Sequence, residues 1–354
     1  MQVSTRSFSG WRGFTLIELL VVVAVIALLI GLLVPALGRA RGIAQTSVCL
    51  SNQRQMAIAN SAYASDEDNF IPGPNTSGLI YRINKQFARQ RGQDSANSFP
   101  MSPMDWMSPT LGPFLDLPRD RNARLLALLN DEFRCPANPW TYDFIFRDNG
   151  EFPDASEISY ASYGSHFTAG AYWDAAHMAS STRFRDSSGN PIGKFLPNFP
   201  PADRAVDIRT SGHKFRTDTL GVLSMKVWTY EGTRFVNSNG ERSFNADDDD
   251  AFGDTFMGRG PTININFDTN GNPHRYKEGT FSRATGRGEL NDTVAQYTFR
   301  HGNEAMTMGF FDGHADVFEE QETRFAKFYF PSGSIVRSTN GFADVTLSVG
   351  ELVP

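Results

Sequence analysis

The sequence holds only two cysteines, Cys49 and Cys135, among its 354 residues. Neither belongs to a CxxC pair, and no group of cysteines and histidines has the short spacing of a zinc-binding motif. The sequence therefore predicts no structural zinc site. Two interpretations of the cysteines stay open: a Cys49–Cys135 disulfide, if this part of the chain lies in an oxidising compartment, and two separately buried thiols.

Basic residues are also scarce outside the N-terminal region. The chain has 33 lysines and arginines against 39 acidic residues, a formal net charge of −6. Residues 1–42 hold four of the arginines and one glutamate, which leaves 29 basic and 38 acidic residues for the rest. An acidic domain excludes general binding to a phosphate backbone, so we expect no nucleic-acid partner.

Catalytic motifs are missing as well. The sequence contains no GxSxG elbow, no Walker motif and no comparable signature. We therefore expect a protein that is not an enzyme.

Apolar sequence, by contrast, is concentrated in one place, residues 13–37, with Glu18 as its one charged residue. The 24 residues from Phe14 to Leu37 suffice to span a bilayer as a helix. The basic, acid-free leader of residues 1–13 favours a cytoplasmic N-terminus and a single pass through the membrane, with the head outside the cytoplasm. A secretory signal peptide would have a shorter apolar region. A carboxylate at hydrocarbon depth is costly without a partner, which makes Glu18 a candidate functional residue.

The front of this run has a specific spacing. Gly13 precedes Phe14, Glu18 is the fifth residue after the glycine, and Pro35 is the twenty-second. This resembles the N-terminal segment of type IV pilins and type II secretion pseudopilins. In that family a prepilin peptidase cuts after the glycine and methylates the new first residue. The resemblance implies a cleaved leader of residues 1–13; an uncleaved signal anchor is the alternative.

Glu18 then has an interpretation as an assembly residue. Cleavage would leave a positive amine on Phe14, and that amine of one subunit could neutralise Glu18 of a neighbouring, homologous subunit. A protonated or snorkelling carboxylate near the interface is the competing interpretation.

The apolar run continues into a predicted stem. Pro35 is expected to kink or locally melt the helix. Residues 38–68 form an amphipathic continuation whose apolar stripe, repeating at Cys49, Met56 and Tyr63, should pack on the head. Turn residues end the helix near 66–69. The predicted domains are therefore the leader, a transmembrane and assembly helix at 14–37, its continuation, and a head at 69–354 with inserted loops.

The head is predicted to be an α+β domain with an antiparallel sheet. A helix is predicted at 121–132. Strands are predicted at 219–231, 262–267, 294–300, 305–311 and 314–319.

The most informative segment of the head is 299–318, FRHGNEAMTMGFFDGHADVF. Asp312-Gly313 between alternating apolar stretches predicts a β-hairpin. With His301 it resembles the C-terminal signature of a group of bacterial prepilin-like proteins, His, nine residues, Asp-Gly. The same group has a cysteine, Asn and Gln on the stem and a later Cys-Pro, matched here by Cys49, Asn52, Gln55, Cys135 and Pro136. Here ten residues separate the histidine from the aspartate, and a strand bulge could absorb the extra one. A structural hairpin is favoured over a metal or catalytic site that includes His314.

A second, weaker candidate is DTNGNPH at 268–274, where Asp268, Asn270 and Asn272 alternate as in a calcium loop. Pro273 and Gly279 stand where such a loop has its glycine and its final glutamate. A turn is therefore favoured over calcium, the one cofactor considered.

Together these features predict a structural subunit of a type II secretion pseudopilus or type IV pilus-like filament. Its expected partners are a prepilin peptidase, homologous subunits and the inner membrane. Two alternatives remain: a membrane-anchored module that binds a substrate or polysaccharide through its head, and a membrane-tethered metal-dependent hydrolase.

Overall fold

The structure is a computed structural model of the whole chain. The residues it describes are 15–73, 77, 95–100, 105–128, 133–138, 141–142, 158–159, 163–165, 208–209, 216–231, 299–302, 304–336, 339, 342 and 344–354. The chain divides into two compact units, residues 1–44 and 45–354, which are described separately.

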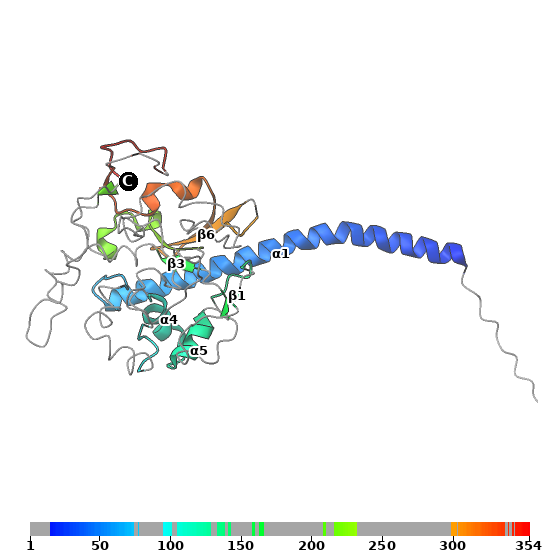
Figure 1. Cartoon of the computed structure of the whole chain (residues 1–354), viewed down its shortest axis with the longest axis horizontal. Coiled ribbons are helices and arrows are strands. Elements are labelled where there is room, and N and C mark those ends of the chain that lie inside the picture. Colours follow the sequence, from blue (N-terminus) through cyan, green and yellow to red (C-terminus); the bar gives the residue numbers. More distant parts are fainter. Residues whose placement is uncertain are drawn as a thin grey trace, which may run out of the picture. The chain divides into compact units, whose positions relative to one another are not determined.

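The dominant element is helix α1, Leu16–Asp66, which has 51 residues (Figure 1). It runs through Pro35 without interruption, so the predicted local melting is wrong. Proline lacks its backbone N–H, so the helix loses only one hydrogen bond here, the one to the carbonyl of Gly31 four positions earlier. The helix ends as Asp68 and Asn69 turn to φ of 49° and 64°, with the Asn69 amide donating to the Ala64 carbonyl at 2.6 Å.

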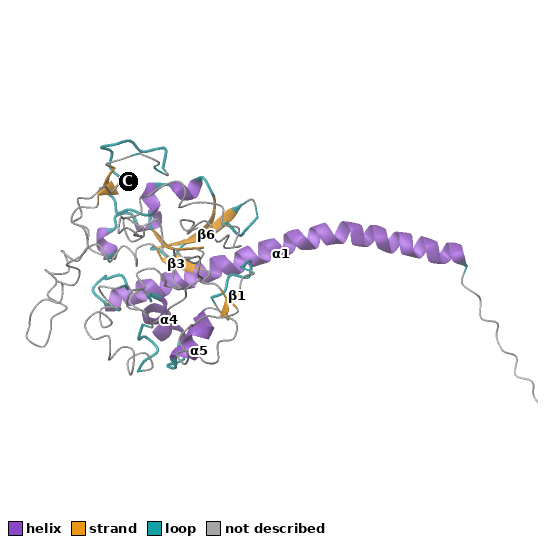
Figure 2. Ribbon diagram, in the orientation of Figure 1, coloured by secondary structure: helices purple, strands orange, loops and turns teal. Residues whose placement is uncertain are grey.

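The head is built from short elements (Figure 2). Among its described residues, the other α-helices are α4, Met107–Leu115, and α5, Arg121–Leu126. Its strands are β1 Thr141–Tyr142, β2 Ile158–Ser159, β3 Tyr163–Ser165, β4 Ile208–Arg209, β5 Val227–Glu231, β6 Ala305–Phe310, β7 Ala315–Glu319 and β8 Ile335–Val336. In the described part of the head, 3₁₀ turns lie at Thr217–Thr219, Leu223–Met225, Glu322–Arg324 and Ala326–Phe328.

The main sheet has the order β3-β5-β6-β7, and every neighbouring pair is antiparallel. Two further antiparallel pairs, β1–β2 and β4–β8, are each two residues long. The predicted α+β class, with a long N-terminal helix and an antiparallel sheet in the head, is confirmed.

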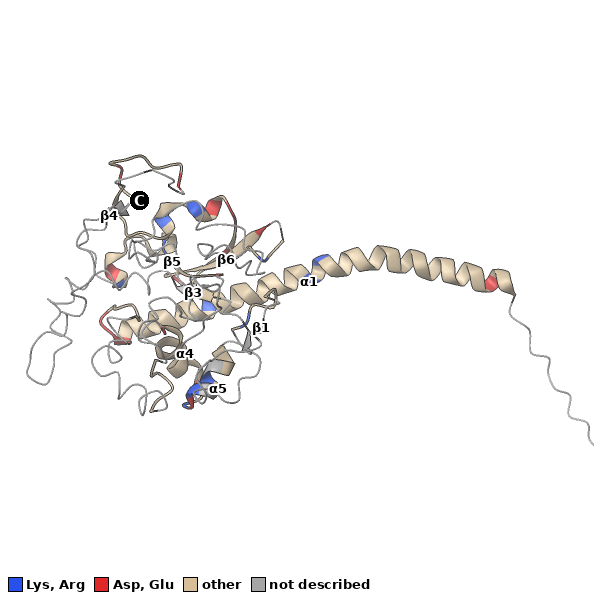
Figure 3. Ribbon diagram, in the orientation of Figure 1, with Lys and Arg blue, Asp and Glu red and all other residues tan. Residues whose placement is uncertain are grey.

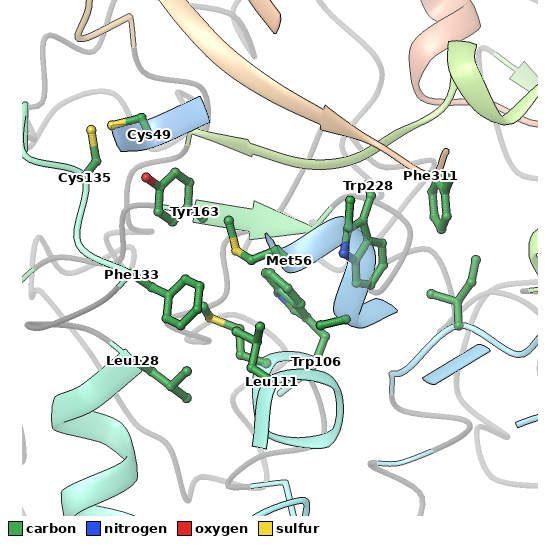
Figure 4. Close-up of a cluster of buried hydrophobic side chains, with 14 of the residues drawn as sticks. Cys49, Met56, Trp106, Leu111, Leu128, Phe133, Cys135, Tyr163, Trp228 and Phe311 are labelled. Atoms are coloured by element: carbon green, nitrogen blue, oxygen red, sulfur yellow. The ribbon is translucent and has the colours of Figure 1, made fainter. Parts of the chain in front are cut away.

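Alternation along the strands separates two apolar cores. Met306, Met308 and Phe310 of β6 enter a core closed by the C-terminal segment, including Tyr329 and Phe330. The intervening β6 residues Thr307 and Gly309 face residues 45–66 of α1. On that side a second core joins α1, α4 and the sheet (Figure 4). A register shift between Val227 and Thr229 makes Trp228 an extra residue of β5, and its side chain enters this second core.

The other predicted elements fare unevenly. Strands at 305–311 and 314–319 are confirmed as β6 and β7. Only the end of the predicted strand 219–231 is a strand, because 3₁₀ turns occupy much of its first half. The predicted helix 121–132 is confirmed for Arg121–Leu126, and residues 129–132 lie outside the described residues, as do 262–267 and 294–298.

Candidate functional site

The N-terminal end of α1 is closed by a capping box. The Thr15 amide and hydroxyl both donate to Glu18 Oε2, at 2.9 and 2.8 Å, and the Glu18 amide donates to Thr15 Oγ1 at 3.2 Å. Threonine followed three residues later by glutamate is the sequence pattern of this motif, which satisfies backbone donors that the first turn leaves unpaired. Glu18 thus has a local structural role that the sequence analysis missed although the pattern TLIE was present.

Beyond this cap the helix is a bare apolar rod. Every residue from 15 to 41 is exposed, including all the large aliphatic side chains between Leu16 and Leu37. Figure 3 shows one acidic position at the start of α1 and uncharged residues from there to the basic position further along. In the part of the chain that the structure describes, α1 is the one helix long and apolar enough to cross a membrane.

The hairpin predicted around Asp312-Gly313 is present. The Phe310 amide donates to the His314 carbonyl at 2.9 Å, the Gly313 amide donates to the Phe310 carbonyl at 3.1 Å, and Gly313 has φ of 94°. This is a three-residue loop with glycine at the left-handed position. The register of β6 and β7 is unbroken from Ala305 to Gly309, so the suggested strand bulge does not lie in these residues of β6.

The signature residues do not form one site. His314 Nδ1 contacts Asp312 Oδ1 at 2.5 Å, and both side chains are partly exposed. His301 lies before the six residues of β6 and Asp312 after them, and a strand of that length spans roughly 17–20 Å. His301 and Asp312 are therefore too far apart to belong to one metal or catalytic site on the hairpin.

His301 instead belongs to a buried cluster, which we call the thiol–histidine cluster: Cys49, Cys135, Glu231 and His301. One donor atom from each residue lies within 4.8 Å of all the others. His301 Nε2 is 2.9 Å from Glu231 Oε1, the Cys135 thiol donates to the same oxygen at 3.0 Å, and the Cys135 sulfur is 3.9 Å from His301 Nε2. Figure 4 shows the sulfur atoms of Cys49 and Cys135 side by side.

Four separate segments supply these residues. Cys49 lies in α1, Cys135 in the segment 133–138, Glu231 at the end of β5, and His301 in the turn that precedes β6. The turn is closed by hydrogen bonds between His301 and Ala305. Neither cysteine is in a disulfide here. Their sulfur atoms lie within 4.8 Å of each other, and the Cys49–Cys135 disulfide stays a prediction.

Burial and the imidazole shape the titration of the cluster. Burial lowers the pKa of His301, but hydrogen bonds to Cys135 and Glu231 and the Glu231 charge outweigh it and raise that pKa to about 10. Burial raises the pKa of Glu231. The hydrogen bond to His301 and the charge of His301 outweigh this effect, so the pKa of Glu231 is lowered overall. Burial, the neighbouring Cys49 and the Glu231 charge raise the pKa of the Cys135 thiol. These directions favour an imidazolium–carboxylate pair of His301 and Glu231 beside a neutral Cys135 thiol.

The surroundings hold these groups in place. Thr46 Oγ1 lies 2.9 Å from His301 Nδ1, and the Thr307 amide donates to Glu231 Oε2 at 2.9 Å. Tyr163 is also buried here; its pKa is raised, first by burial and then by the neighbouring groups, which include the Glu231 carboxylate.

The other residues named from the sequence have various outcomes. Asn52 is buried and its amide donates to the Tyr163 hydroxyl at 3.4 Å. Gln55 instead donates to Ser51 on the outer side of α1, at 3.3 Å, and the buried glutamine is Gln53. Gly13, Phe14 and the calcium candidates Asp268, Asn270 and Asn272 lie outside the described residues.

Comparison with known proteins bears on the N-terminal end. Residues 12–34 match the family model described as the prokaryotic N-terminal methylation motif. No curated protein and no solved structure matches the chain. The match supports a pilin-like or pseudopilin-like protein, and together with α1 it fits a chain anchored in a membrane by a single pass.

Proposed function

We propose that this chain is a structural subunit of a filament of the type IV pilus or type II secretion pseudopilus kind. A prepilin peptidase cuts it after Gly13, and α1 holds it first in the inner membrane and then in the filament, with the head outside the cytoplasm. The observation that carries the proposal is the methylation motif at 12–34, which covers the start of a helix whose apolar side chains from Leu16 to Leu37 are all exposed. A rod of this kind needs lipid or other copies of itself around it.

The capping box adds a constraint on how Glu18 works. A cut after Gly13 leaves Phe14 as the first residue, directly before the capping Thr15. One Glu18 oxygen accepts the Thr15 donors. We assign the carboxylate two tasks: it caps its own helix, and its charge pairs with the Phe14 amine of a neighbouring subunit.

Mass spectrometry of the N-terminus of the membrane-extracted protein tests the processing. We expect a chain that starts at N-methyl-Phe14. An intact Met1, or a start near Ala36 or Ala40, would reject prepilin-type processing.

Two matched variants separate capping from charge pairing. Glu18→Gln keeps a side chain that can complete the capping box but removes the charge. Thr15→Val removes the capping hydroxyl and keeps the charge. We expect both to be cleaved, Thr15→Val to enter sheared filament fractions, and Glu18→Gln to stay in the membrane.

Normal incorporation of Glu18→Gln would show that charge pairing is not needed for assembly. Wild-type chains that are processed but stay in the membrane under all conditions would favour the membrane-anchored binding module instead. N-terminal mass spectrometry of both variants checks that each was cleaved.

A further inference from the structure

We propose that the thiol–histidine cluster binds one zinc ion and that this ion fastens the stem helix to the head. The inference concerns residues 45–354, the unit that contains Cys49 and the head, and is independent of filament assembly. It rests on the donor atoms, their distances and the groups that hold them.

The geometry suits an ion of this size. Zinc binds thiolate sulfur at about 2.3 Å and imidazole or carboxylate at about 2.0–2.2 Å, so tetrahedral donors lie roughly 3.2–3.8 Å apart. The measured separations are 2.9 Å for nitrogen to oxygen, 3.0 Å for sulfur to oxygen and 3.9 Å for sulfur to nitrogen. Shifts of a few tenths of an ångström would bring these three donors to coordination distances.

The donor set selects the metal. Two sulfurs, one imidazole nitrogen and one carboxylate oxygen suit zinc, whereas calcium and magnesium prefer oxygen ligands alone. Four protein ligands leave no coordination position for water, which is the arrangement of a structural site rather than a catalytic one.

The supporting contacts are those a zinc site requires. The Thr46 hydroxyl contacts His301 Nδ1 and so leaves Nε2 directed at the cluster. The Thr307 amide holds the second oxygen of Glu231. Partners of this kind fix the ring and the carboxylate of metal ligands.

Charge and protons also balance. Zinc takes both cysteines as thiolates and His301 as a neutral ligand, and the displaced protons pass to solvent. With the Glu231 carboxylate the loaded site carries one net negative charge.

The first experiment uses the full chain in mild detergent under reducing conditions. We expect about one zinc ion per chain by elemental analysis, a fall in the unfolding temperature when a chelator removes it, and recovery with zinc but not with magnesium. Replacement by cobalt should give the near-ultraviolet charge-transfer absorption of a thiolate-bound ion. The proposal is overturned if the chain contains no zinc and its unfolding temperature does not change with chelator or with added zinc.

Variants then locate the ion. Cys135→Ser and His301→Gln should lose the ion, and Thr46→Val, which removes the hydroxyl that contacts the His301 ring, should weaken zinc binding by about 10- to 100-fold. His314→Gln is the matched control, because this histidine is exposed on the hairpin and should leave zinc binding unchanged. Retention of zinc by both ligand variants would contradict the assignment.

Two readouts guard against misfolding and oxidation. Far-ultraviolet circular dichroism shows whether each variant is folded. If a ligand variant is unfolded, the cobalt spectrum of the wild type shows instead whether thiolates bind the ion. Peptide mapping without reduction shows whether Cys49 and Cys135 are linked, and a stoichiometric disulfide in the isolated protein would overturn the zinc site.

Discussion

At the scale of single residues, the stem helix is unusual in the polar groups that it buries against the head. Gln53 is fully buried. Its amide donates to the Thr307 carbonyl at 3.0 Å, and its carbonyl oxygen accepts from the Thr229 hydroxyl. Buried polar groups are tolerated when they are paired in this way. Gln53 therefore ties α1 to two adjacent strands of the sheet.

Replacing Gln53 by leucine should destabilise the head. The change leaves the Thr229 hydroxyl and the Thr307 acceptor buried without this partner, at a cost of about 1–3 kcal/mol. Chemical denaturation of the detergent-solubilised chain measures the loss. Gln55→Leu on the same helix is the control, expected within about 0.5 kcal/mol of wild type. Equal losses for the two variants would mean that the Gln53 hydrogen bonds contribute nothing specific.

Lys226 gives the head a pH dependence. Its ammonium donates to the main-chain oxygens of Lys327 and Pro354, both at 2.8 Å. Burial, with a contribution from the Lys327 charge, lowers the pKa of Lys226 to about 8. In the unfolded chain that pKa is about 10.4. Between these values the unfolded state binds more protons, so the free energy of unfolding rises with pH.

We expect this gain to be about 3 kcal/mol across that window, with the full penalty present below pH about 8. Lys226→Met carries no titrating group, so the stability of the wild type relative to this variant should rise by that amount. Denaturation curves of both chains between neutral and alkaline pH give the difference. Parallel profiles would show that burial does not depress this pKa.

At the scale of elements, the packing of α1 on the sheet depends on a glycine. A Cβ atom on Gly309 of β6 would lie 2.7 Å from Thr229 Oγ1 and 3.0 Å from Gln53 Oε1. Side chains do not approach so closely, so the helix can lie at its observed distance only because this position has no side chain.

Gly309→Ala should therefore cost about 1–3 kcal/mol through overpacking. Gly302→Ala is a matched control, because nothing lies within 4 Å of a Cβ there and the position is exposed. Thermal unfolding followed by circular dichroism compares the two. An unchanged melting temperature for Gly309→Ala would show that the helix can move away from the sheet at little cost.

At the scale of the whole molecule, the chain combines an exposed apolar segment with a head that has its own cores. Residues 15–41 contribute no buried side chain, and the first fully buried residue of α1 is Cys49. Stability of the head should therefore not depend on the segment that anchors the chain.

Deleting residues 1–41 should release the protein from membranes and leave its unfolding temperature within about 3 °C of that of the full chain, because the described part of this segment, residues 15–41, is exposed, and exposed residues contribute little to the free energy of unfolding. Membrane fractionation and circular dichroism test the two parts. An unfolded or aggregated product would contradict the independence of the head.

How far the sequence predicts this molecule depends on the range of the interactions. The apolar helix, the position of Glu18 and the Asp312-Gly313 hairpin follow from local patterns. The apolar stripe predicted Cys49 and Met56 as buried, but not Gln53, because its partners lie in strands more than 170 residues away. Periodicity reports which face is buried and not which polar groups are paired there.

The thiol–histidine cluster was missed for the same reason. Short spacing identifies zinc motifs whose ligands are neighbours in the sequence, whereas this cluster joins residues 96 and 70 positions apart, Cys135 to Glu231 and Glu231 to His301. Its glutamate had no distinguishing context in the sequence. Only the pairing of β5 with β6 brings it beside the histidine.

The cluster has a consequence for chain topology. Because its four residues meet at one point, the polypeptide between them forms a series of closed loops with a common node. The entropic cost of closing a flexible loop grows only with the logarithm of its length. Insertions or deletions between these residues can therefore enlarge or shrink the head while the node, and the register of helix against sheet beside it, stays where it is.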